Sequence, residues 1–147
     1  MQLKRAVAII VTCVALSAAT YAAQGPSVPP VPPVVRRGLD AYRSSGGDAA
    51  VRAWLVNSPL ANDSGAANSV IVLRRLEQAY GSMVGDEVLK VNPIGNHVVR
   101  VYVVLLFQKG PVYMWLECYE TKSQWLVSAF LFNPRPDPIL PLTLLDH

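Results

Sequence analysis

Histidine and cysteine are scarce in this chain, which has two of each among its 147 residues. The histidines are His97 and His147, and neither has the spacing to cysteine or carboxylate residues that is typical of a metal site. No serine lies in a Gly-x-Ser-x-Gly context, and no glycine-rich loop of the kind that cradles phosphate is present. The sequence therefore contains no motif that predicts a catalytic residue, a metal ligand or a cofactor site.

The first 23 residues have the pattern of a secretory signal peptide. Lys4 and Arg5 precede an apolar run from Ala6 to Ala19, and small residues follow it. We expect cleavage near residue 23 and release to the periplasm or the exterior, with no membrane attachment afterwards. An uncleaved anchor is an alternative, although the apolar run is short for a bilayer. Cys13 raises the further alternative of a lipoprotein signal, but its preceding apolar run is shorter still.

Cleavage of this segment would change the charge and the cysteine count. The whole chain has 13 Lys and Arg and 10 Asp and Glu, a formal net charge of +3. Lys4 and Arg5 leave with the signal, so 11 basic minus 10 acidic residues give +1. A nearly neutral protein gives no support for nucleic-acid binding. Cys118 would be the one cysteine left, which excludes an intramolecular disulfide, and we expect it to be a buried core residue.

Residues 24–34 are rich in proline and are predicted to form an extended linker. A single folded domain is predicted to follow, over residues 35–147. Apolar residues at helical spacing predict three helices in its first half. They span Val35 to Arg43, Ala49 to Val56 with Asp48 as the N-cap, and Val70 to about Tyr80 after a cap at Asn68 or Ser69. Leu60 to Ala67 is predicted to be a loop.

Residues 98–132 contain three apolar runs separated by two short loops, which is typical of an antiparallel meander. We place the centre of the first turn between Lys109 and Gly110, and that of the second between Lys122 and Ser123. Glu87 to Val91 is predicted to be a fourth strand. The predicted fold class is therefore α+β, with three N-terminal helices packed on one face of a curved four-strand antiparallel meander.

Alternation along these strands predicts two different sheet faces. A charge-free face, expected to be the core side, carries Val101, Val103, Leu105, Phe107, Val112, Met114, Leu116, Cys118, Trp125, Val127, Ala129 and Leu131. The opposite face, called the aromatic face below, carries the candidate binding residues Arg100, Tyr102, Tyr113, Trp115, Glu117, Tyr119, Phe130 and Phe132. The turn position places Arg100 opposite Tyr119 and Tyr102 opposite Glu117. Only a bulge would exchange residues between the faces.

Three segments carry a resemblance to a known superfamily. Y-V-V-L-L-F-Q-K-G-P at 102–111, W-L-V-S-A-F-L-F-N at 125–133 and P-I-L-P at 138–141 resemble small secreted bacterial proteins without an assigned function. These belong to the nuclear-transport-factor-2-like, cystatin-like α+β superfamily. The resemblance covers about residues 35–141. It implies a fold but no single function, because the superfamily includes isomerases, dehydratases and non-enzymatic binding modules.

Enzymes of that superfamily have an acid–base residue, usually Asp or His, in a pocket between the helices and the concave sheet face. The charge-free face of this chain offers no such group. Asp40 and Tyr42 of the first predicted helix are the residues able to enter such a pocket from its mouth, although an exposed Asp40 is the simpler interpretation.

The aromatic face leads to the predicted function, because a large exposed apolar patch usually marks an interaction surface. We expect a secreted, non-enzymatic domain, without a cofactor, that self-associates or binds a protein partner through this face. The alternative is a binder of a small apolar ligand, or an isomerase- or dehydratase-like enzyme, that uses a cavity between helices and sheet. A competing outcome for the aromatic face is that Leu140 to Leu145 folds back and covers it within one chain.

Overall fold

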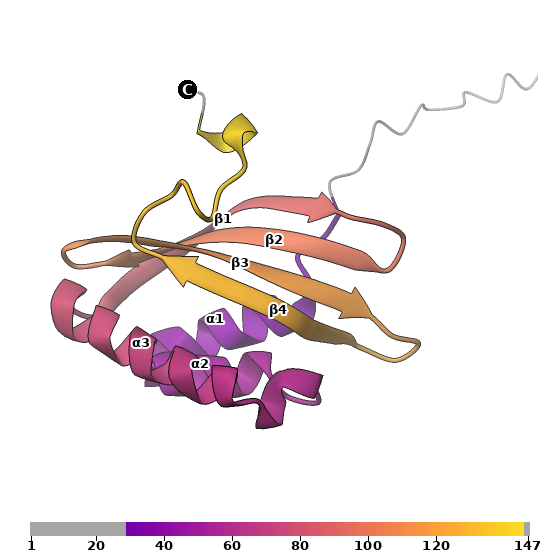
Figure 1. The fold of residues 1–147 in the computed structure, drawn as a ribbon, viewed down its shortest axis with the longest axis horizontal. Coiled ribbons are helices and arrows are strands. Elements are labelled where there is room, and N and C mark those ends of the chain that lie inside the picture. The colour runs from indigo at the N-terminus through magenta and orange to yellow at the C-terminus, as the bar shows by residue number, and fades with distance from the viewer. Residues whose placement is uncertain (1–28, 146–147) are drawn as a thin grey trace, which may run out of the picture.

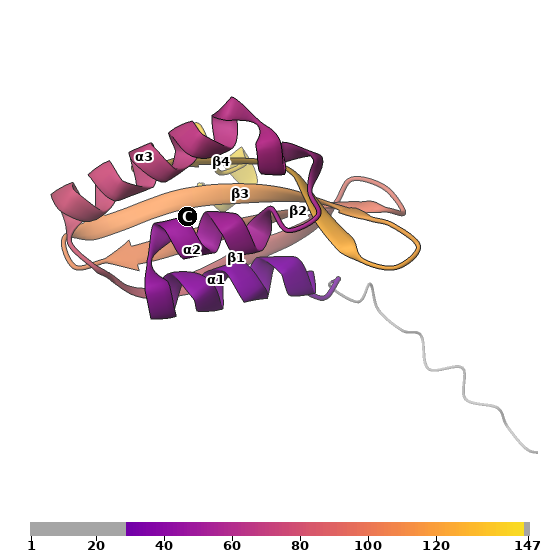
Figure 2. The same ribbon diagram turned by 90° about the horizontal axis from the view of Figure 1, so that it is seen from below.

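The computed structural model describes residues 29–145. The elements, in chain order, are α1 (Pro33–Ser45), α2 (Gly47–Trp54), the 3-10 helix η1 (Pro59–Asn62), α3 (Ser64–Tyr80), β1 (Met83–Pro93), β2 (Val98–Phe107), β3 (Gly110–Glu120), β4 (Trp125–Asn133) and the 3-10 helix η2 (Leu142–Leu144). The strands form one antiparallel sheet in the order β1-β2-β3-β4. The three α-helices lie on one side of it and the C-terminal tail on the other (Figures 1 and 2). The predicted α+β class and helix-on-meander arrangement are confirmed, whereas the signal peptide and Cys13 lie outside the described residues.

The first two helices begin differently from the prediction. α1 starts at Pro33, two residues before the predicted start. Proline suits the first turn of a helix, because a backbone N–H there has no carbonyl acceptor within the helix. Pro32, assigned above to the linker, is buried. α2 is preceded by Gly46, whose φ of 80° favours glycine, and Asp48 does not cap it. Asp48 instead forms an ion pair with Arg74 of α3, which lowers the pKa of the Asp48 carboxyl.

α3 begins six residues before the predicted start and includes part of the segment that was predicted to be a loop. Its cap is Asp63, whose Oδ1 accepts a hydrogen bond from the backbone N–H of Gly65 at 2.9 Å. The small residues that follow suggested a loop, but alanine is the best helix former and Gly65 costs little in the first turn. The helix ends at Tyr80, as predicted, and Gly81 follows it with a φ of 83°.

The core lies between the charge-free face and the helices. The strands contribute its most completely buried residues, Val101, Val103, Leu105, Val112, Met114, Leu116, Cys118 and Val127, and the helices add Val35, Leu39, Val51, Trp54 and Leu73. The indole of Trp54 is fixed by a hydrogen bond from its Nε1 to the Val35 carbonyl at 3.2 Å. Burial of this continuous apolar surface is the main contribution to the stability of the fold.

The turn between β2 and β3 lies one residue earlier than predicted. Phe107 pairs with Gly110, so the loop consists of Gln108 and Lys109 alone. Every cross-strand partner therefore shifts by two residues, and Arg100 lies opposite Glu117 instead of Tyr119. Tyr102 likewise lies opposite Trp115 instead of Glu117. An even shift preserves the side-chain alternation, which is why the two predicted faces remain correct for these strands.

The predicted faces are wrong for the second half of β4, because the strand contains a bulge. Val127 pairs with Cys118, but the next pair is Ala129 with Glu117, so Ser128 is an extra residue. Beyond the bulge the faces exchange. Phe130 pairs with Leu116 and Phe132 with Met114, which places both rings against the helices instead of on the aromatic face. Ala129 and Leu131 move to the aromatic face in their place. The exchange packs two partly buried phenylalanines against the core, and Phe130 contacts Trp54 with 6.4 Å between ring centroids.

Candidate functional site

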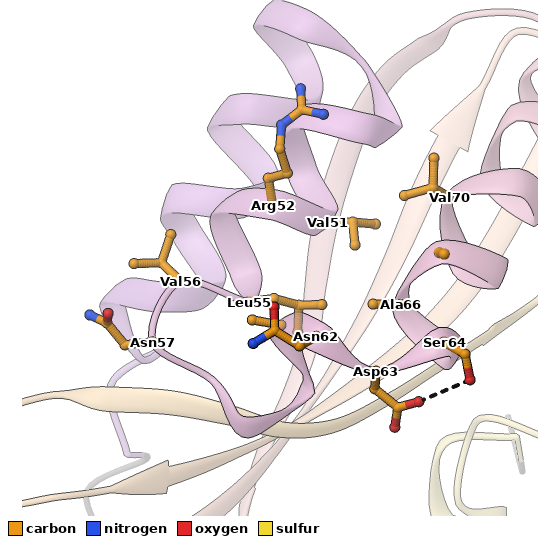
Figure 3. A pocket seen from close by; sticks show the side chains of 12 residues that line it. Val51, Arg52, Leu55, Val56, Asn57, Asn62, Asp63, Ser64, Ala66 and Val70 are labelled. Carbon is orange, nitrogen blue, oxygen red and sulfur yellow. Dashed lines mark hydrogen bonds between the residues drawn. The ribbon is translucent and has the colours of Figure 1, made fainter.

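A groove with a volume of about 680 Å³ lies between α2, η1 and the first half of α3. Val51 of α2 and Leu55, which caps the end of that helix, form one wall, and Ala66 and Val70 of α3 form the other (Figure 3). The groove exists because the first half of α3 carries small residues, which leave space where a core helix would present leucine. Leu73 is the one residue of α3 that is fully buried, and Val70 is only half-buried.

The rim of the groove is polar. Arg52 stands on the α2 side, and it makes no ion pair among the described residues. Asp63 stands on the opposite side, where its carboxylate accepts hydrogen bonds from the Gly65 N–H at 2.9 Å and the Ser64 hydroxyl at 3.3 Å. Asn57 and Asn62 complete the rim. Asp63 thus has a structural role as the cap of α3 through Oδ1, whereas Arg52 makes no ion pair in residues 29–145.

A smaller, more polar cavity of about 300 Å³ lies at the other end of the helical layer, beside Tyr42 and Glu77. The Tyr42 ring packs edge-on against Phe107, with 6.1 Å between centroids. Burial, and then the neighbouring Glu77, raise the pKa of the Tyr42 hydroxyl, which therefore stays neutral. The Glu77 carboxylate accepts a hydrogen bond from the Gly47 N–H at 3.0 Å.

Asp40, the other residue considered for a pocket mouth, is exposed and does not enter either cavity. It pairs with Arg43 at 2.5 Å on the surface of α1. The second guanidinium nitrogen of Arg43 reaches Asp86 of β1 at 2.6 Å, and the Asp86 side chain is almost completely buried. Asp40 and Asp86 therefore serve an ion-pair network that ties α1 to β1.

Five of the predicted binding residues meet on the aromatic face. Arg100 donates to Glu117 across the strands at 2.7 Å and lies 4.7 Å from the ring centroid of Trp115. The hydrogen bond to Glu117 raises the pKa of Arg100. Tyr102 and Tyr113 lie beside this group. Tyr119 is exposed near the end of β3, whereas Phe130 and Phe132 lie on the opposite side of the sheet.

The C-terminal tail covers part of this face. Ile139 and Leu140 are buried against Tyr102, with Tyr113 and Trp115 at the edge of the cluster. The tail runs over the side of the sheet that faces away from the helices (Figure 1). Coverage of the aromatic face by the tail of the same chain, the competing outcome given above, is thus observed around Tyr102.

The groove residues were missed at the level of the sequence. Val51 and Leu55 lay in a predicted helix, but Ala66 on the other side of the groove lay in a segment predicted to be a loop, and Val70 was predicted to be the first residue of its helix. The available signal was Asp63, a good N-cap residue, followed by a run of small residues with the periodicity of a helix.

No protein-family model, no curated protein sequence and no solved structure matches the chain. Within residues 29–145, no three or more His, Cys, Asp or Glu side chains gather as a metal site would require. None of the helices in that part of the chain is long and apolar enough to cross a membrane.

Proposed function

We propose that this is a secreted binding domain whose groove between α2 and α3 takes a small amphiphile, an apolar chain that ends in an anionic head group. The observation that carries the proposal is the groove itself, about 680 Å³ with apolar walls and a polar rim. Small-molecule sites commonly have volumes of about 300–1,000 Å³, mostly apolar linings and a few polar groups that orient the ligand. The sequence analysis left a small apolar ligand as an alternative, but it placed that ligand in a cavity between helices and sheet, whereas this groove lies between α2, η1 and α3.

The chain and the head group contribute differently. Burial of each methylene group contributes about 0.8 kcal/mol when it is complete, so an alkyl chain lying along Val51, Leu55 and Val70 accounts for most of the affinity. An exposed ion pair contributes about 0–1 kcal/mol, so Arg52 selects the sign of the head group and fixes the direction of the chain. A neutral alcohol should therefore bind only a little more weakly than the carboxylate, and an alkylammonium more weakly still.

Calorimetric titration with decanoate, decanol and decylammonium tests this order. Ala66→Leu fills the groove wall and should abolish or strongly weaken binding of all three probes. Ala79→Leu is the matched control, because Ala79 is an exposed residue of the same helix outside the groove. Unchanged decanoate binding by Ala66→Leu, with the fold intact by circular dichroism, would contradict the proposal.

Charge removal at the rim is the second arm of the test. Arg52→Gln should abolish the preference for decanoate over decanol and leave decanol binding unchanged, because the alkyl contacts remain. Arg75→Gln provides the matched control on the exposed side of α3, outside the groove. If Arg52→Gln and Arg75→Gln behave alike, Arg52 does not orient the ligand.

Self-association, or binding of a protein partner, through the aromatic face is a second candidate function. It is favoured by Leu106, Tyr119 and Leu131, which remain exposed on that face beyond the tail. The order of elements, with helices before a meander, also supports the resemblance to the nuclear-transport-factor-2-like superfamily, whose members include binding modules. Sedimentation of Tyr119→Lys tests this candidate, since a contact made by the face should be weakened by a charge at its exposed tyrosine.

A further inference from the structure

The two edges of the sheet are protected to very different degrees. β1 carries the charged residues Asp86, Glu87 and Lys90, ends at Pro93, and has two irregularities in its pairing with β2. Charges, proline and bulges on an outer strand prevent it from pairing with another chain. β1 is therefore an edge strand that is protected against the addition of a further strand from another chain.

β4, the other edge, has none of these charges. Its nine residues, W-L-V-S-A-F-L-F-N, contain no charged residue, no proline and no glycine. Its first half is occupied in other ways, because the Val127 carbonyl accepts a hydrogen bond from the Ser58 hydroxyl at 2.6 Å and Ser128 forms the bulge. The five residues from Ala129 to Asn133 form the open edge and have no partner strand on their outer side in the described structure.

From Ala129 to Phe132, side chains along this open edge are apolar on both faces. Leu131 is 47% exposed on the aromatic face. Phe130 and Phe132 stack with 6.3 Å between centroids on the helix side, where both remain partly accessible. A cavity of about 240 Å³ adjoins Phe130 and Ala129, between β4 and the start of α3. An added strand would thus find backbone hydrogen-bonding groups, apolar side chains and a recess along one line.

We infer that this edge pairs antiparallel with the same edge of a second copy of the chain, with Leu131 at the centre, so that two four-strand sheets become one continuous sheet. This register sets Leu131 opposite the partner's Leu131, and Phe130 opposite the partner's Phe132. Aromatic pairs that face each other across antiparallel strands are favourable, and a strand without charge meets no repulsion from its own copy. A two-fold pairing closes on itself, so both open edges are covered in a dimer.

The inference does not rest on the ligand groove, and it differs from self-association through the aromatic face, because backbone groups of β4 make the contact. Substitutions of Leu131 and Leu106 distinguish edge pairing from association through the aromatic face. Both are exposed leucines of the aromatic face, at 47% and 40%, but Leu131 lies on the open edge strand and Leu106 on the inner strand β2. A lysine at Leu131 should therefore disrupt edge pairing, whereas a lysine at Leu106 should not.

Sedimentation velocity over a range of micromolar concentrations provides the test. The wild-type protein and Leu106→Lys should show the same monomer–dimer equilibrium, and Leu131→Lys should sediment as a monomer throughout. If both lysine variants weaken dimerisation equally, the dimer forms through the aromatic face, and the edge contact is overturned. A wild-type protein that is monomeric at every concentration, or a Leu131→Lys variant that still dimerises, would overturn it as well.

A disulfide test reports the register directly. Residues directly opposite in an antiparallel pair have Cα atoms about 4.5–5.5 Å apart, which suits a disulfide. Leu131→Cys should form a disulfide between the two introduced thiols under mild oxidation, identified by mass spectrometry of the linked peptide. Ala129→Cys should not link to itself, because its counterpart in the dimer is Asn133. Self-linking of both variants, or of Ala129→Cys alone, would contradict the register centred on Leu131.

Discussion

Trp54 packs so closely on Gly38 that a Cβ at position 38 would lie 2.0 Å from the Nε1 atom of the indole. The ring cannot turn away freely, because Nε1 also donates to the Val35 carbonyl at 3.2 Å, and Trp54 is almost completely buried. Gly38 lies within α1 and has a helical backbone. Glycine is required there because it has no side chain, and not because the backbone conformation is unusual. The contact sets how closely α1 and α2 approach each other.

We therefore predict that Gly38→Ala destabilises the protein. Alanine is about 1 kcal/mol better than glycine inside a helix, but a buried side chain without space typically costs about 1–3 kcal/mol and here forces a large indole to move. We expect a lower free energy of unfolding, measured by denaturant titration. Gly65→Ala in α3 is the control, because its Cβ would meet no atom closer than 3.6 Å and the variant should be neutral or slightly more stable. A Gly38→Ala variant at least as stable as wild type would contradict this packing.

The two corrections to the sheet show what the sequence could and could not specify. The charge-free face was predictable for β2 and β3, because a shift of the turn by an even number of residues leaves each side chain on its face. The bulge at Ser128 was not, because the strand is apolar on both sides and hydrophobic alternation does not distinguish Phe130 from Leu131 as the inward residue. The preference comes from packing against Trp54, which is a contact between residues 76 positions apart.

The candidate groove was less predictable than the fold. It needs α3 to begin at Ser64, a start set by the hydrogen bond between Asp63 and the Gly65 N–H. It also needs α2 and α3 to be held side by side, and part of that contact is the ion pair of Asp48 with Arg74. Neither pairing follows from the local pattern, because helix spacing indicates which face is apolar but not which neighbour covers it.

Cys118 should be inert toward thiol reagents in the folded protein. It is fully buried, and burial followed by the nearby Glu117 raises the pKa of its thiol to about 12, so almost no thiolate is present at neutral pH. Labelling by a maleimide should be slow in buffer and should accelerate sharply when denaturant unfolds the protein. Rapid labelling of Cys118 in the native state, detected by peptide mass spectrometry, would mean that this part of the core opens readily.

The same pKa shift predicts a pH dependence of stability. The thiol is protonated in both states below its ordinary pKa of 9.0, so it has no effect there. Between 9.0 and about 12 the unfolded chain loses the proton while the folded protein keeps it, so the free energy of unfolding falls as pH rises. Denaturant titrations on both sides of the ordinary thiol pKa should show this fall, and it should be smaller in Cys118→Ala. An identical pH dependence in both proteins would contradict the shift.

Tyr42→Phe should leave the protein as stable as wild type or make it more stable. The Tyr42 hydroxyl is buried and finds no hydrogen-bond partner of good geometry among the described residues, although Glu77 lies nearby. A buried polar group without a partner costs about 1–3 kcal/mol, and phenylalanine removes it while keeping the edge-on contact with Phe107. Tyr42→Leu serves as the control, because it removes the hydroxyl and the aromatic contact together and should be destabilising. A loss of more than about 1 kcal/mol in Tyr42→Phe would instead indicate that the hydroxyl bonds to Glu77 in solution.

The last prediction concerns the tail, in which Ile139 and Leu142 differ in environment. Ile139 is 4% exposed and packs with Leu140 over Tyr102, whereas Leu142 is 75% exposed a few residues later. Removing a buried branched side chain typically costs about 2–5 kcal/mol, but this cluster is small and lies outside the main core, so we expect about 1–3 kcal/mol for Ile139→Ala. Leu142→Ala should change the free energy of unfolding by less than about 0.5 kcal/mol. Ile139→Ala should also make Trp115 more accessible to a fluorescence quencher, because Trp115 borders the cluster that the isoleucine closes. If the two alanine variants have equal stability and equal quenching, the tail does not cover the aromatic face in solution, and the whole face becomes available for a partner.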